Sequence, residues 1–208
     1  TYFLALGAGF MLATALIEMV PEAVRLSGEE VALFFVLTGY FLVHLFEHTL
    51  APHFHFGEET HPAEMRHHHA STSALVGLLI HTFFDGVAIG SGFLVSSWLG
   101  LVIFVAILLH KMPEGFTVAS LLLAAGKTRG SALLGSALLG AATLFGVLLM
   151  WLLQSALAYT LPLSAGVTLY VAASDLMPEV NREPGVRISV VVFIGVALLF
   201  VIHRLLHV

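Results

Sequence analysis

The sequence predicts an all-α polytopic membrane protein, a bundle of helices that cross the bilayer several times. The chain has 208 residues, of which 59% are hydrophobic and only 10% are charged, and its mean hydropathy is +1.00. An ordinary soluble domain is about 45–50% apolar and about 25% charged. The composition therefore excludes a soluble enzyme. The net charge of −5 without a basic stretch excludes nucleic-acid binding, and the lack of cysteine excludes disulfides and thiol chemistry.

Apolar segments long enough to cross a bilayer recur along the whole chain. A helix needs roughly 20 apolar residues to cross the hydrocarbon core. Their continuous apolar character, interrupted by small residues rather than by alternating polar ones, favours helices over barrel strands. We expect one transmembrane domain over residues 1–208, with spans at about 1–24, 31–51, 73–97, 98–125, 131–157, 163–181 and 186–206.

Lysine and arginine residues predict the orientation, because they accumulate in cytoplasmic loops. One side of the predicted membrane carries Arg25 and Arg204. The other side carries Arg66, Lys127, Arg129, Arg182 and Arg187. This asymmetry places the connection 52–72 in the cytoplasm and the C-terminus outside. We expect the membrane to be a bacterial plasma (inner) membrane.

An internal repeat is visible at the ends of two spans. Residues 18–22 (EMVPE) and 175–179 (DLMPE) share the pattern acid-x-x-Pro-Glu, and each is followed by an arginine and a short turn. The next span in each case ends with His-x-x-x-His, at His44 and His48 and at His203 and His207. The two copies run in opposite directions, as in many secondary transporters. A partner helix is then expected before residue 1, which would give eight spans in a 3+2+3 inverted repeat.

Ionisable residues concentrate in the two central spans. Residues 81–86 read HTFFDG and residues 110–115 read HKMPEG, so each span carries a histidine and a carboxylate one helical turn apart on one face. Ionisable groups at membrane depth are costly and mark functional sites. Two imidazoles and two carboxylates suit Zn²⁺, Fe²⁺, Mn²⁺ or Cd²⁺. The alternative is two unrelated histidine–acid hydrogen bonds that only stabilise their helices.

These two segments resemble the signature fourth and fifth transmembrane helices of the ZIP (Zrt-, Irt-like) metal transporters. The histidine-rich loop, the Pro-Glu span ends and the inverted repeat extend the resemblance over essentially the whole chain. It implies that the visible spans are the second to eighth helices of that family, and that divalent metal enters the cytoplasm between the fourth and fifth helices, with an elevator-like movement. It also implies a principal metal site formed by His81, Asp85, His110 and Glu114, which Met11 approaches.

The sequence departs from the family where some members hold a second metal ion. The positions after the two histidines are Thr82 and Lys111, and residues 131–155 contain no carboxylate. An ammonium group would repel a second cation. We therefore expect a mononuclear site, with Lys111 paired to Asp85 or Glu114 when no metal is bound. The alternative is that Lys111 extends away towards the membrane surface.

Acids and histidines at span ends are candidates for the entrance and the exit. Glu18 and Glu22 would attract cations at the outer end. Asp175 and Glu179 are expected to receive them at the inner end, near His44, Glu47 and His48. Each of these residues, like His203 and His207 at the outer end, can equally be a solvated helix terminus.

The connection 52–72 has the composition of a flexible metal buffer or sensor, and we do not expect transport to need it. It contains six histidines, which are His53, His55, His61, His67, His68 and His69.

The function predicted from these features is a membrane transporter for Zn²⁺, with Cd²⁺, Fe²⁺ and Mn²⁺ as further substrates, and not an enzyme. We expect no catalytic cofactor. The expected partners are the metal ion and the lipid bilayer. The Gly86-x-x-x-Gly90 stripe can pack within the bundle or between protomers, and in the second case the protein would be a homodimer.

A membrane-embedded zinc hydrolase is the alternative function. Such an enzyme needs a zinc ion with an open position for water. It would also be expected to carry a serine one turn before a histidine, and none stands four residues before His44, His81 or His110. The H-E-x-x-H motif of metalloproteases does not occur. A metal sensor that does not transport is the third alternative. It leaves the inverted repeat unexplained, because such repeats are typical of transporters.

Overall fold

The protein is helical throughout the part of the chain that its computed structural model describes, residues 2–50 and 68–206. Seven helical stretches in these ranges are long and apolar enough to cross a membrane. Most histidines of the predicted loop 52–72 lie outside the described residues, as does His207. The elements are α1 (Tyr2–Ala13), η1 (Thr14–Met19), α2 (Val20–Ser27), α3 (Glu29–Leu50), α4 (His68–Val95), α5 (Ser97–Ala124), α6 (Arg129–Leu152), η2 (Gln154–Ala156), α7 (Leu157–Tyr170), η3 (Val171–Leu176), α8 (Met177–Asn181) and α9 (Val186–Leu206).

Two of the connections between helices are tight turns that the sequence specifies. Ser96 caps α5, where its side chain accepts a hydrogen bond from the Leu99 amide at 3.1 Å, and Thr128 caps α6 through the Ser131 amide at 3.2 Å. Hydroxyl residues are favoured at this position because they satisfy amides that have no partner within the helix. The α4–α5 connection is therefore a single capping residue, and it makes the two central helices antiparallel neighbours.

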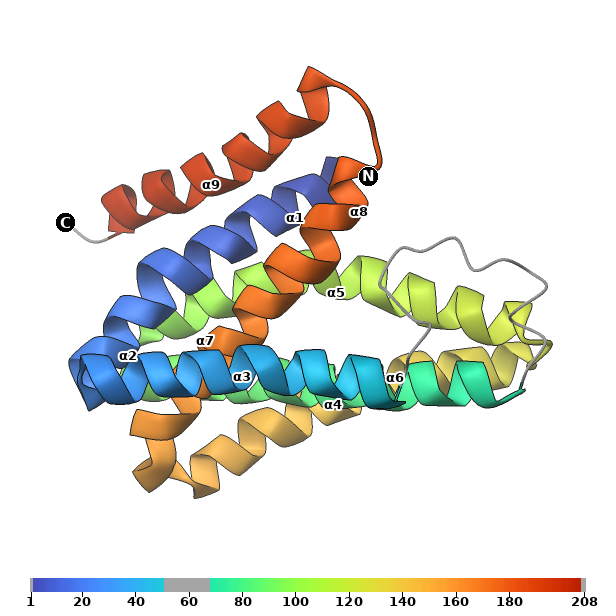
Figure 1. Cartoon of the computed structure of the whole chain (residues 1–208), viewed down its shortest axis with the longest axis horizontal. Helices are drawn as coiled ribbons and strands as arrows, with labels where there is room; N and C mark the ends of the chain where they lie inside the picture. The colour runs from blue at the N-terminus through green and yellow to red at the C-terminus, as the bar shows by residue number, and fades with distance from the viewer. Residues whose placement is uncertain (1, 51–67, 207–208) are drawn as a thin grey trace.

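The outer helices form two matching pairs, α1 with α9 and α3 with α7. In Figure 1, α1 runs from upper right to lower left, whereas α7 and α8 rise from lower left to upper right. A Cβ atom on Gly9 of α1 would lie 2.1 Å from the Val192 carbonyl oxygen, and one on Gly166 of α7 would lie 1.9 Å from the Val36 carbonyl oxygen. Only glycine permits such close backbone approach.

The reciprocal contacts of the two pairs also match. A Cβ atom on Gly195 would lie 2.3 Å from the Leu6 carbonyl oxygen, and one on Gly39 would lie 2.0 Å from the Leu163 carbonyl oxygen. Each of these two glycine contacts in the first pair thus has a counterpart at the equivalent position of the second. The predicted inverted repeat is confirmed at the level of individual backbone contacts.

The acid-Pro segments adopt the same unusual backbone in both copies of the repeat. Both η1 and η3 are π-helical turns, and in each a wider hydrogen bond closes the turn, from the Val20 amide to the Ala15 carbonyl and from the Met177 amide to the Ala172 carbonyl. The proline that follows lacks an amide donor and its ring crowds the preceding turn, which favours this widening. Glu18 and Asp175 therefore occupy equivalent places in the two π-turns.

The terminal histidine motifs do not share the register of these contacts. The glycine contacts make Gly39 the counterpart of Gly195, and in that register the counterpart of His203 is Glu47. The correspondence between the two His-x-x-x-His motifs is therefore displaced by about one helical turn. The repeat is real, but these histidines are not equivalent within it.

The central helix α4 packs closely on α6. A Cβ atom on Gly86 would lie 1.9 Å from the Thr143 carbonyl oxygen, and one on Gly90 would lie 2.8 Å from the Met150 Cβ atom. The Gly86–Gly90 stripe thus packs within the bundle, where it fixes the helix that carries Asp85.

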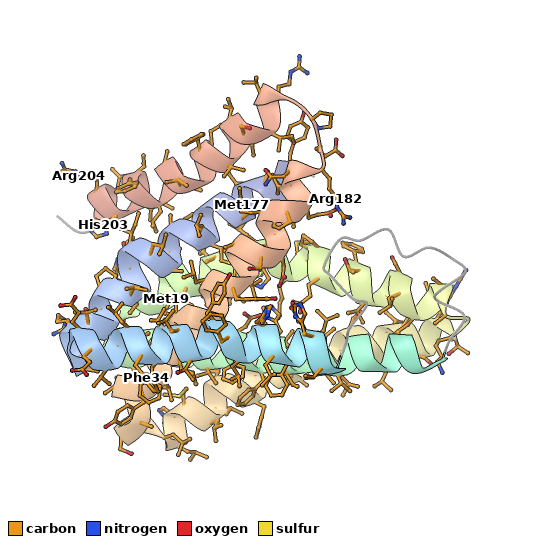
Figure 2. The ribbon with its side chains drawn as sticks, viewed as in Figure 1. Met19, Phe34, Met177, Arg182, His203 and Arg204 are labelled. Carbon is orange, nitrogen blue, oxygen red and sulfur yellow. The ribbon has the colours of Figure 1, made fainter. Side chains whose placement is uncertain are left out.

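Large apolar side chains cover the outside of the bundle, as expected for helices in contact with lipid. They project from nearly every ribbon in Figure 2, where Phe34 is labelled. Examples with more than half of their surface exposed are Phe34, Leu133, Leu144, Trp151 and Phe193. Together with the seven apolar helices, this surface identifies an integral membrane protein.

Candidate metal site

Four side chains of types that can bind a metal ion meet where α4 and α5 face each other. His81 and Asp85 come from α4, and His110 and Glu114 from α5. One ligand atom from each lies within 4.8 Å of all the others, and no second group of three or more such residues occurs among the described residues. Asp85, His110 and Glu114 are buried, and the His81 side chain is 11% exposed. The one-turn spacing on each helix and the antiparallel crossing bring all four to the same depth.

A backbone contact orients the imidazole of His110. Its Nδ1 atom lies 3.2 Å from the Ala106 carbonyl oxygen. A carbonyl oxygen can only accept, so Nδ1 carries the proton and donates, which leaves a lone pair on Nε2. Nε2 faces the cluster and lies 3.4 Å from Asp85 Oδ2. This is the arrangement typical of metal-binding histidines, in which one nitrogen is held by the protein and the other can bind metal.

Lys111 lies between the two buried carboxylates. Its Nζ atom is 2.6 Å from Asp85 Oδ2 and 2.8 Å from Glu114 Oε2. Without a cation, two carboxylates this deeply buried would repel each other and lose their hydration. The ion pair expected from the sequence is present, and it involves both acids rather than one. Lys111 therefore points into the cluster and does not extend towards the membrane surface.

The cluster concentrates polar atoms that make no hydrogen bond. Among the described side chains, buried atoms without such a partner include His110 Nε2, Asp85 Oδ1 and Glu114 Oε1. Buried polar groups in folded proteins are nearly always satisfied, so exceptions of this kind require an explanation. A bound cation would satisfy a lone pair on each of these atoms at once.

Two neighbouring residues differ in how they relate to the cluster. Thr82 is fully buried, and its hydroxyl donates to the Leu79 carbonyl oxygen at 3.1 Å. That hydroxyl is used within its own helix. Met11 is also fully buried and belongs to the same apolar core as Ala106, one turn before His110. Its role as a ligand stays a prediction.

The predicted exit residues lie apart from the four-residue cluster. Asp175 is buried in η3, and Glu179 forms an ion pair with Arg182 at 3.1 Å. Neither belongs to the group of ligands at the centre. The nearby Glu47 accepts a hydrogen bond from the Tyr170 hydroxyl at 2.8 Å. Their part in an exit path stays a prediction.

Contacts at the opposite end of the bundle were not foreseen. Glu18 Oε1 lies 2.7 Å from His203 Nδ1, and the Trp98 indole donates to Glu18 Oε2 at 3.4 Å. Glu22, the other predicted entrance acid, is paired with Arg25. Glu18, Trp98 and His203 lie far apart in the sequence, and no local spacing signals that they meet.

The fold and this cluster together define a class of protein, a polytopic membrane protein with a buried N/O site suited to a transition metal. Residues 57–203 match the family described as ZIP Zinc transporter. The chain belongs to this family.

Several similar proteins are named as transporters. Zinc transporter ZIP9 of Micropogonias undulatus is 32% identical over 158 residues, which cover 70% of this chain and 50% of that protein. Zinc transporter ZIP13 of Rattus norvegicus is 34% identical over 115 residues, which cover 52% of this chain and 32% of that protein. Metal cation symporter ZIP14 of Xenopus tropicalis is 34% identical over 105 residues, 50% of this chain and 23% of that protein. The chain thus spans half the length or less of these relatives.

Proposed function

We propose that this protein carries a divalent transition metal, Zn²⁺ foremost, across the membrane into the cytoplasm. The ion would bind to His81, Asp85, His110 and Glu114. The observation that carries the proposal is the convergence of these four ligands, within 4.8 Å of one another, from two helices of a ZIP family member. Two imidazole nitrogens and two carboxylate oxygens suit tetrahedral Zn²⁺, and Cd²⁺, Fe²⁺ and Mn²⁺ are further substrates.

Lys111 supplies a cation to the same carboxylates when no metal is bound. The ammonium contacts Asp85 Oδ2 and Glu114 Oε2, whereas Asp85 Oδ1 and Glu114 Oε1 have no partner among the described residues, so a metal ion on the free oxygens would lie beside the ammonium and the two cations would repel each other. Metal binding therefore weakens the ion pairs of the ammonium with these carboxylates, and the ammonium in turn favours release of the metal. A second metal ion beside the first is disfavoured, because Lys111 occupies that side and α6 offers no carboxylate.

The direction of transport and the compartment rest on the arginine and lysine asymmetry. Cytoplasmic loops are rich in these residues, which favours a cytoplasmic location for segment 52–72 and for the Asp175 end of α7–α8. We propose a plasma-membrane location, with the histidines of 52–72 buffering metal on the cytoplasmic side. Transport is favoured over hydrolysis for two reasons. The relatives given above are named as transporters, and inverted repeats are typical of secondary transporters.

Metal uptake into proteoliposomes tests this function. We compare the intact protein with His110→Ala and Glu114→Ala, and use Met112→Leu as the matched control, because Met112 lies on the same helix and is 57% exposed. Loss of an outer contact to a metal ligand costs about 10- to 100-fold in affinity, so loss of a ligand should cost at least that. Zn²⁺ influx should vanish in both ligand variants and persist in the control.

Two outcomes would overturn the proposal. Zn²⁺ uptake that persists in both ligand variants would show that the transport pathway does not pass between α4 and α5. Liposomes that stay empty while the intact protein binds one metal ion tightly would instead favour the hydrolase or sensor function.

A further inference from the structure

The Glu18 carboxylate joins three helical segments at one end of the bundle. Its two oxygens face His203 of α9 at 2.7 Å and the indole nitrogen of Trp98 in the first turn of α5 at 3.4 Å. The rings of Trp98 and His203 also pack edge to face, with centroids 5.8 Å apart. The Glu18 side chain is only 9% exposed. Figure 2 shows His203 on the left side of the view, where Met19 also lies, with Arg182 further to the right.

The helices divide into a central group and a repeat group, and two further apolar cores join these groups to each other. The central group is α4, α5 and α6, which share an apolar core that includes Leu78, Val118 and Leu139. The repeat group consists of α1 to α3 and α7 to α9 with their π-turns, and the glycine contacts described above hold its pairs together. A transported ion bound by α4 and α5 therefore belongs to the central group, and its access depends on how this group sits against the repeat group.

Two side-chain hydrogen bonds cross between the groups near Ser96, which forms the α4–α5 connection. One is the bond from Trp98 to Glu18. The other joins Ser91 of α4 to Thr160 of α7 at 3.3 Å. Both lie on the same side of the four metal ligands, towards what we call the Ser96 end of the bundle.

The repeat-related position at the opposite end has different chemistry. The counterpart of Glu18 is Asp175, and the counterpart of His203 is Glu47, so a carboxylate stands where the imidazole would be. Two of the hydrogen bonds described near this position, from Tyr170 to Glu47 and between Tyr40 and Ser174, lie within the repeat group. The two ends are thus related by the fold but differ in the side chains at equivalent positions.

We propose that Trp98, Glu18 and His203 are positioning residues for transport, which latch the central group to the repeat group at the Ser96 end and close the metal site from that side. This inference rests on the proposed transport function. Release of the Trp98–Glu18 contact allows the two groups to separate there. A divalent cation that arrives at this end competes for the Glu18 oxygens, because carboxylate and imidazole are ligands for the same ions, so cation arrival favours opening.

A single reporter cysteine tests the latch, because the chain contains no cysteine. Ala88 is fully buried in a core cluster with Leu161 and Ala165 of α7, at the boundary between the groups and between Asp85 and Ser96. In an Ala88→Cys background reconstituted into liposomes, we measure the rate of labelling by a membrane-impermeant maleimide applied at the Ser96 end. The variants are Trp98→Phe, which keeps the ring and loses the donor, and Glu18→Met, which keeps the length and loses both acceptors.

The account predicts faster labelling in both variants. A hydrogen bond of ordinary net strength corresponds to a change of about 2- to 10-fold in the open population, and we expect an increase in that range. The matched control is Tyr40→Phe, which loses a hydroxyl hydrogen bond within the repeat group and should label at the parent rate. Zn²⁺ binding to the central site, measured on the same samples, should be retained in all three.

Labelling at the parent rate in both latch variants would overturn the inference. An equal increase in Tyr40→Phe would also overturn it, because it would show a general loosening rather than a latch. Failure of the proposed transport function is seen separately, as absent Zn²⁺ uptake by the intact protein, since labelling does not require transport.

Discussion

The central cluster and the π-turns hold buried carboxylates in different ways. In the cluster, Asp85 and Glu114 share the ammonium of Lys111, at 2.6 and 2.8 Å. In η1, Glu18 is held by the ring nitrogens of Trp98 and His203, which belong to two other helices. A cationic partner on a long side chain can be exchanged for another cation, whereas ring donors that come from two separate helices connect those helices. This difference is consistent with the proposed ion exchange at the centre and with the proposed helix positioning at the Ser96 end.

The largest expected effect is on stability, and it comes from removing the exchangeable cation. Lys111→Met leaves two carboxylates buried without a counter-ion, which typically costs about 3–5 kcal/mol. We expect a strongly lowered midpoint in thermal unfolding without metal. Zn²⁺ should restore much of the loss, and it should stabilise the variant more than the parent, because it no longer competes with the ammonium. Equal midpoints in variant and parent without metal would contradict the counter-ion role.

A smaller loss of stability is expected when the close packing within the repeat group is disturbed. Gly9→Ala and Gly166→Ala each place a methyl group within 2.1 Å or less of a backbone oxygen of the paired helix. Overpacking of this kind costs about 1–3 kcal/mol. The two variants should be destabilised alike, because they occupy equivalent positions of the repeat.

Gly140→Ala is the matched control for these glycine variants. A Cβ atom there meets nothing within 4 Å, so helix propensity should make the change neutral or slightly stabilising. The melting midpoints of the three variants are compared by thermal unfolding in detergent. A lower melting midpoint in only one of Gly9→Ala and Gly166→Ala would show that the two repeat copies do not make equivalent contacts.

The smallest effect is expected at the end of the repeat group that contains Asp175. Tyr170→Phe removes the hydrogen bond to Glu47, worth about 1 kcal/mol, and should lower the melting midpoint by about 2–4 °C. The gain in midpoint on adding Zn²⁺ should match that of the parent, because Tyr170 lies outside the four-ligand group. A variant that loses its response to Zn²⁺ would place this end within the metal site.

The parts of the fold that the sequence predicts are those that depend on local spacing. The seven apolar stretches follow from hydrophobic length, and the approach of His81, Asp85, His110 and Glu114 follows from two one-turn spacings on adjacent spans. The involvement of Lys111 was expected, but not its contact with both acids at once. That detail depends on the depth at which α4 and α5 cross.

The parts that the sequence does not predict depend on register between distant helices. Many glycines occur in the spans, and nothing local shows that Gly9 faces Val192 or that Gly39 faces Leu163. The same applies to the meeting of Glu18 and His203, because it depends on how far α9 is displaced along α1. The two His-x-x-x-His motifs even suggest the wrong alignment of the two repeat copies. Aligning the motifs displaces one copy by about one helical turn from the register of the glycine contacts.

The most direct test of the central claim is the zinc stoichiometry and X-ray absorption spectrum of the purified protein. The account predicts one Zn²⁺ per chain, with imidazole and carboxylate ligands at about 2.0–2.2 Å and no second zinc at about 3.5–4 Å. The bound zinc should be lost in His110→Ala. Two zinc ions per chain, or an unchanged spectrum in that variant, would contradict a mononuclear site between α4 and α5.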